Sequence, residues 1–180
     1  MINGFLLILD TFWGVNGVLK AYEGDITTFH EVEYICNAAN GIGPMGAGVA
    51  GAIRKAGGAI IEQEATEVCK RLNPQPGTLY VTSAGSLPFK GVIHLVTMKF
   101  PGGFTDYDIV SRCLESLREF CRTYKVSSVA LPALGTGVGR LNPVLVAELF
   151  KRHLGVPSST QFWVVDIDKR FIECFKSLRV

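Results

Sequence analysis

The fold is decided most clearly by residues 126–143, which read VSSVALPALGTGVGRLNP. Residues 126–131 carry four apolar residues and no charge, which predicts a buried strand. Residues 135–139 follow as a glycine-rich loop. Asn142 and Pro143 then suit the N-cap and first-turn positions of a helix. This stretch therefore predicts a strand, a loop and a helix in succession, as in an α/β fold.

A second stretch of the same kind covers residues 32–72. Residues 32–38 predict a buried strand, residues 41–51 form a glycine-rich loop, and residues 52–72 predict a helix. In open α/β sheets such loops lie where ligands bind, at the carboxyl ends of the strands. Uncovered backbone N–H groups and a helix N-terminus there favour an anion such as phosphate. Tight turns or close helix–sheet packing would explain the glycines of either loop taken alone.

The remaining elements complete one domain over residues 1–180. Residues 4–9 and 18–22 predict a hairpin or two paired strands, so that the N-terminal segment 1–22 joins the sheet edge. Thr105 is expected to cap a long helix and Asp168 a closing helix. Further strands are expected at residues 78–83, 92–98 and 162–167. Strands alternating with helices predict a three-layer α/β/α fold with a mixed, largely parallel central sheet.

Composition limits the class of protein. Of 180 residues, 48% are hydrophobic and 19% charged, and the mean hydropathy is +0.28, which excludes a disordered chain. The net charge of +2 gives little support to a nucleic-acid partner, although a local basic patch stays open. Five widely spaced cysteines without a CxxC pair argue against a disulfide framework and a thiolate zinc site. The sequence contains no evident export signal or membrane span, so we expect a cytoplasmic protein with no membrane partner.

Several well-known catalytic and cofactor motifs are missing from the sequence. No Gly-Lys-Ser/Thr follows either glycine-rich loop, and no acidic residue ends the next strand to hold the ribose of a dinucleotide. The chain has neither an HExxH nor a GxSxG motif. We therefore expect no metal and no cofactor. His94 is expected in the core, and Lys99 is either a functional cation or a solvated loop lysine.

Three polar residues remain as candidates at strand ends. Asp25 lies in Gly24-Asp25-Ile26-Thr27, where an N-cap or an Asx turn explains it locally. Asn37 and Asn40 flank two alanines where a buried strand ends. Amides at such a place need a backbone or ligand partner.

In combination, these blocks resemble the macrodomain family of ADP-ribose-binding α/β/α modules. The resemblance covers the chain from about Leu19 onward and rests on residues 24–27, 37–40, 46–58, 92–94 and 131–139. It implies that Asp25 accepts a hydrogen bond from the adenine amino group and that Asn40 bonds the distal ribose. It also implies that residues 46–50 wrap the distal ribose and diphosphate, and that residues 135–139 cradle the diphosphate. The ligand-binding residues that it implies are Asp25, Ile26, Asn37 (as a brace for the loops), Asn40, Gly46, Ala47, Gly48, Val49, Ala50, Gly135, Thr136, Gly137, Val138, Gly139 and Ile167 (near the adenine).

The chain departs from two catalytic branches of that family. Ala50 stands where one hydrolase branch has an acidic residue. Met98 stands where another branch has a catalytic lysine, and Gly139 where that lysine has its acidic partner. The resemblance thus leaves open a binding module for free or protein-linked ADP-ribose and an enzyme. The enzyme would be an ADP-ribosyl hydrolase or an ADP-ribose 1″-phosphate phosphatase, in which Asn40 positions the distal ribose for attack by water. Binding of RNA or poly(ADP-ribose) in the same cleft is a third, less supported alternative.

Overall fold

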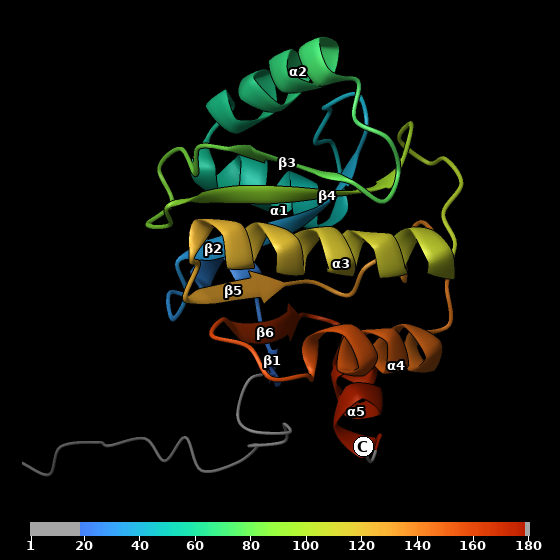
Figure 1. Ribbon diagram of the computed structural model, residues 1–180. Helices are drawn as coiled ribbons and strands as arrows, with labels where there is room; N and C mark the ends of the chain where they lie inside the picture. The colour runs from blue at the N-terminus through green and yellow to red at the C-terminus, as the bar shows by residue number, and fades with distance from the viewer. Residues whose placement is uncertain (1–18, 179–180) are drawn as a thin grey trace, which may run out of the picture.

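The structure, a computed structural model, describes residues 19–178 and has a central sheet with helices on both faces (Figure 1). The sheet has six strands in the order β1-β6-β5-β2-β4-β3. β3 pairs antiparallel with β4, and the other neighbours are parallel. The strands are β1 (Leu19–Glu23), β2 (Tyr34–Asn40), β3 (Leu79–Thr82), β4 (Gly91–Met98), β5 (Ser128–Leu131) and β6 (Gln161–Asp166). This is the three-layer α/β/α fold with a mixed, largely parallel sheet that the sequence predicts.

Helices form the two outer layers. They are the short 3-10 helix η2 (Ile26–Thr28), α1 (Gly48–Gly57), α2 (Ile60–Leu72), α3 (Tyr107–Tyr124), α4 (Pro143–Leu154) and α5 (Lys169–Ser177). In Figure 1, α3 crosses in front of the sheet and α1 lies behind it. Buried side chains of α3, α4 and α5 form one core with the sheet. On the opposite face α1 and α2 pack over two smaller clusters.

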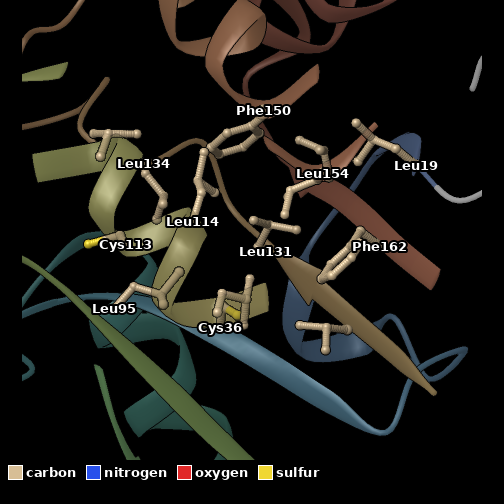
Figure 2. Close-up of a cluster of buried hydrophobic side chains, with 14 of the residues drawn as sticks. Leu19, Cys36, Leu95, Cys113, Leu114, Leu131, Leu134, Phe150, Leu154 and Phe162 are labelled. Atoms are coloured by element: carbon tan, nitrogen blue, oxygen red, sulfur yellow. The ribbon is translucent and has the colours of Figure 1, made fainter. Parts of the chain in front are cut away.

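The larger core is continuous across the front of the sheet. Figure 2 shows Leu114 of α3 and Phe150 of α4 beside Leu131 of β5, with Phe162 of β6 in the same cluster. All four side chains are almost completely buried. Burying one such side chain stabilises a fold by ~1.5–3 kcal/mol. The core therefore holds the parallel strands together, and their carboxyl ends lie at one edge of the sheet.

Two sequence predictions about helices are corrected by the structure. The helix expected over residues 52–72 is two helices, because Gly58 between them has a φ of +97°, which ends α1. α1 also begins earlier, at Gly48. The N-cap of α3 is Asp106, whose side chain accepts from the N–H of Ile109 at 2.8 Å. Thr105, the predicted cap, is instead buried, and its hydroxyl has no partner.

Other predicted features agree with the structure. Asn142 caps α4 with Pro143 at its start, and Asp168 caps α5 through the N–H of Arg170. The strand predicted at residues 18–22 is β1, which lies at one edge of the sheet and pairs with β6. The strand predicted at residues 4–9 lies outside the described residues.

The cysteines and the helices add two observations. All five cysteines belong to the described part of the chain and are free thiols. Burial raises the pKa of the Cys36 and Cys113 thiols, so these side chains stay neutral core residues. No helix in the described part is both long and apolar enough to span a membrane.

Candidate functional site

A cleft of about 590 Å3 crosses the carboxyl-end edge of the sheet. Its volume is within the ~300–1,000 Å3 that small-molecule sites occupy. Because five strands are parallel, the loops that follow β1, β2, β4, β5 and β6 all meet at this edge, and each contributes to the lining. All the site residues implied by the sequence resemblance, Asn37 excepted, line this one cleft.

Side chains on both sides hold the first glycine-rich loop. The Oδ1 atom of Asn40 accepts from the N–H groups of Ile42 and Gly43 at 3.0 and 2.8 Å. Its Nδ2 atom donates to the carbonyl of Pro44 at 2.8 Å. From the other side, Oε1 of Glu62 in α2 accepts from the N–H of Met45 at 2.7 Å. Asn40 thus shapes the loop as well as lining the cleft.

The first glycine-rich loop leads directly into the N-terminus of α1. The N-cap residue is Ala47, which has no polar side chain to accept from the helix. The first N–H groups of a helix have no partner within it, and its dipole makes this end favourable for an anion. Gly48, Val49 and Ala50, the first residues of α1, all line the cleft. A Cβ atom at Gly46 or Gly48 would meet no heavy atom within 4 Å. The φ of +58° at Gly48 favours glycine there, whereas Gly46 has no such requirement.

In the second glycine-rich loop, the surrounding atoms and the backbone conformation require glycine at two positions. A Cβ atom at Gly139 would lie 2.3 Å from the Thr105 methyl group and 2.5 Å from the carbonyl oxygen of Gly135. Gly135 itself has a φ of +74°. Two backbone hydrogen bonds close the loop, from Arg140 to Gly137 and from Leu141 to Gly135. Packing therefore fixes this loop, whereas a Cβ atom at Gly137 would point into open space.

The β1 and β6 end of the cleft is acidic. The Oδ1 atom of Asp25 accepts from both the N–H and the hydroxyl of Thr27 at 2.8 Å, which caps η2 as the local sequence explanation predicts. The same residue lines the cleft, so the cap and a ligand role are compatible. Ile167 is 79% exposed beside it, on the loop after β6. An exposed isoleucine at a cleft wall offers an apolar surface to a flat ligand ring.

Asn37, which was predicted to brace the loops of the site, has a different place in the structure. Its side chain is 1% exposed and does not line the cleft. The register pairs Asn37 with His94 on β4, and its Nδ2 atom lies 3.1 Å from His94 Nδ1. The other ring nitrogen of His94 lies 2.9 Å from the hydroxyl of Thr82 on β3. Asn37 therefore joins neighbouring strands rather than bracing the loops.

The two residues of uncertain role, His94 and Lys99, both stay out of the cleft. Burial lowers the pKa of His94 to about 3, so the ring is neutral, and the core position predicted for it is confirmed. The ammonium of Lys99 bonds Oδ1 of Asn73 at 2.5 Å and the carbonyl of Pro74 at 3.2 Å. It ties two loops together and does not line the cleft.

Comparison with known proteins identifies the fold family. A model of the Macro domain family matches residues 36–150. The chain belongs to the Macro domain family. An uncharacterized protein of Aquifex aeolicus is 34% identical over 164 residues, which are 89% of this macrodomain and 96% of the relative. A Macro domain-containing protein of Methanosarcina mazei is 38% identical over 121 residues, 66% of this chain and 62% of that protein.

Solved macrodomains share the whole architecture. The Oceanobacillus iheyensis macrodomain with ADP has a TM-score of 0.78 at 26% identity, and the match covers 91% of this chain and 90% of that one. A variant of the same macrodomain, solved with ADPR, gives the same score and identity, with 91% and 92% covered. The macrodomain of Thermus aquaticus DarG has a TM-score of 0.73 at 27% identity over 82% of this chain and 97% of that chain.

The macrodomain cleft carries few acid–base groups at its β2 and β4 end. Ala50 and Met98 line the cleft there, and Gly139 lies in the loop opposite. The acidic residues of the lining are Asp25, Asp166 and Asp168. Asp25 follows β1, Asp166 is the last residue of β6, and Asp168 follows β6. In the sheet order, β5 separates these carboxylates from β2, the strand that ends at Asn40.

Sequence reasoning missed Asp166, Pro101 and Gly102 among the lining residues of this macrodomain. Asp166 is the last residue of β6, and its carboxylate accepts from the N–H of Ala133 at 2.9 Å and of Asp168 at 2.8 Å. Pro101 and Gly102 follow the end of β4. The rule that ligands bind at the ends of parallel strands, applied to every strand and not to the glycine-rich loops alone, would have found all three.

Proposed function

We propose that this macrodomain binds ADP-ribose, free or attached to a protein, along the cleft. One observation carries the proposal: a single cleft joins an acidic and apolar end at Asp25 and Ile167 to the uncapped N-terminus of α1 between two glycine-rich loops. A base with a donor amino group suits the first end, and a diphosphate suits the second. The Oceanobacillus iheyensis macrodomains solved with ADP and with ADPR support this assignment.

Each part of the ligand has a matching part of the cleft. Thr27 occupies Oδ1 of Asp25, so we assign Oδ2 as the acceptor for the adenine amino group. The ring would lie against Ile26 and Ile167, and the diphosphate against the backbone N–H groups of the two loops. Each charge-assisted N–H contact contributes roughly 1.5–3 kcal/mol, so four or five, after the losses on binding, support a micromolar complex of about −8 kcal/mol.

Binding without catalysis is the activity that the residues favour. Hydrolysis at the distal ribose needs a group that activates water or protonates the leaving group. Ala50 and Met98 supply neither. Asn40, the candidate for positioning the distal ribose, already uses its Oδ1 atom for Ile42 and Gly43. The acidic side chains of the lining lie at the adenine end.

Titration calorimetry with ADP-ribose, followed by product analysis on a mono-ADP-ribosylated protein, tests the proposal. We expect micromolar binding and no release of ADP-ribose. Asp25→Asn keeps an oxygen to cap η2 but loses the carboxylate, so affinity should fall at least tenfold, about 1.4 kcal/mol, with thermal stability retained. Release of ADP-ribose would establish the hydrolase instead, and unchanged affinity in Asp25→Asn would remove the adenine assignment.

A further inference from the structure

A rigid turn follows β4 at the rim of the cleft. The N–H of Gly103 donates to the carbonyl of Phe100 at 2.9 Å, so residues 100–103 form a closed turn. Pro101 and Gly102 are its central residues, and Gly102 has a φ of +73°. Proline followed by a glycine of positive φ is the pattern of a type II turn, whose shape is set before any ligand arrives.

The turn and the residue that directly follows it carry two exposed aromatic rings. Phe100 is 59% exposed and Phe104 is 74% exposed. Pro101 and Gly102, which lie between them in the sequence, line the cleft, but neither phenylalanine does. A nucleotide bound along the cleft would therefore reach the turn and leave both rings uncovered. Single exposed apolar side chains are common, but two large rings at one preformed turn beside a binding cleft indicate a contact surface.

The turn lies at the opposite end of the cleft from Asp25. β4 is four positions from β1 in the sheet order, which is roughly 19 Å at the usual strand spacing. Two residues after the turn, the methyl group of Thr105 occupies the space above Gly139, where a Cβ atom would be only 2.3 Å away. This contact fixes Phe104 next to the second glycine-rich loop. With adenine at Asp25, the group linked to the distal ribose leaves the cleft at this turn.

We propose that Phe100 and Phe104 form a second binding surface for the polypeptide that carries the ADP-ribose, and that they select modified proteins with apolar side chains next to the modified residue. The inference rests on the proposed function, since it takes the ADP-ribose unit as the ligand of the cleft. It adds a specificity determinant outside the nucleotide cleft. Rigid aromatic rings suit this role because they bury a large area at a small loss of side-chain entropy.

Charge favours a polypeptide over a nucleic acid at this surface. Polynucleotide binding depends on several Lys or Arg side chains that contact phosphates. Residues 96–106 contain one basic residue, Lys99, and its ammonium already bonds Asn73 and Pro74. On the facing loop Arg140 is the nearest basic residue in sequence to Gly139. Two phenylalanines with so little positive charge match apolar side chains better than a phosphate backbone.

The test compares free ADP-ribose with two synthetic peptides, each ADP-ribosylated on one serine. One peptide has Leu and Phe on both sides of that serine, and the other has Gly and Ser. Wild-type protein should bind the apolar peptide at least tenfold more tightly than the polar peptide or free ADP-ribose. The double variant F100A/F104A should lose this tenfold preference and keep its affinity for free ADP-ribose within twofold. Leu72→Ala, which removes an exposed side chain from α2, should change none of these values.

Each other outcome overturns part of the account. Equal preference for the apolar peptide in wild type and in F100A/F104A would overturn the inference and leave ADP-ribose binding intact. An equal loss for free ADP-ribose would place the rings on the nucleotide, not on the polypeptide. A single-stranded DNA oligonucleotide that binds wild type and fails to bind F100A/F104A would replace the polypeptide by a nucleic acid. If wild type binds no form of ADP-ribose, the proposed function fails, and the inference fails with it.

Discussion

The two glycine-rich loops look alike in sequence but are held in place by different forces. In the first loop, Gly41 and Gly43 are tightly packed, whereas a Cβ atom at Gly46 or Gly48 would meet open space. The side chains of Asn40 and Glu62 accept hydrogen bonds from the N–H groups of this loop. The second loop has glycines at positions 135 and 139 that the surrounding atoms require. Gly46 of the first loop therefore leaves room for a ligand, whereas Gly135 and Gly139 of the second mainly permit the fold.

The comparison predicts the largest effect at the packed glycine. Gly139→Ala places a Cβ atom against Thr105 and the Gly135 carbonyl, so the free energy of unfolding should fall by about 3 kcal/mol. Gly137→Ala, two residues away and facing open space, is the matched control. It should stay within about 0.5 kcal/mol of wild type, with any gain coming from the less flexible unfolded chain. Urea denaturation measures both, and equal losses would mean that the two glycines do not differ in this way.

A second prediction concerns His94 of β4, which lies opposite Asn37 of β2, the strand that leads into the first loop. His94 is neutral in the fold because burial lowers its pKa to about 3, whereas in the unfolded chain it takes up a proton near pH 6.5. The unfolded state therefore binds more protons below pH 6.5, and stability falls as the pH is lowered. Between pH 7 and pH 5 the contribution of His94 should be a loss of about 2 kcal/mol.

Chemical denaturation at several pH values measures that loss. His94→Gln should show a flatter pH dependence than wild type, because glutamine does not titrate. His30→Gln, which changes an exposed histidine, should follow wild type closely. A His94→Gln curve parallel to that of wild type would show that His94 is not the group whose protonation opposes the fold.

The smallest predicted effect tests the side-chain support of the first loop. Glu62 does not line the cleft but accepts from the N–H of Met45. Glu62→Ala should weaken ADP-ribose binding about fivefold, near 1 kcal/mol, because the loop loses one of its braces. Glu62→Gln keeps an acceptor oxygen and should bind within twofold of wild type. Calorimetry that finds Glu62→Ala unaffected would show that the loop keeps its shape without this contact.

Local sequence signals predicted a large part of the structure. Asn142 with Pro143 and Asp168 marked helix starts correctly, since capping depends on neighbouring backbone groups. The strand–loop–helix order predicted that the glycine-rich loops meet at one edge of the sheet. Most implied site residues gather in the cleft for this reason.

The features that the sequence did not predict depend on contacts between distant residues. Gly139 meets Thr105, and Asn37 meets His94, across the fold. Nothing in the local pattern shows that Thr105 turns its methyl group toward a glycine 34 positions later, leaving Asp106 as the cap. Likewise, a run of small residues does not reveal that Gly58 adopts a positive φ and divides the predicted helix.

The most direct test of the central claim is titration of ADP-ribose into wild type and Gly46→Leu. Position 46 tolerates a Cβ atom without contact, so the variant should keep the thermal stability of wild type while its side chain fills the cleft. We predict micromolar binding by wild type and at least a thirtyfold weaker affinity for Gly46→Leu. Equal binding by a folded Gly46→Leu protein, or no binding by wild type, would contradict the assignment of ADP-ribose to this cleft.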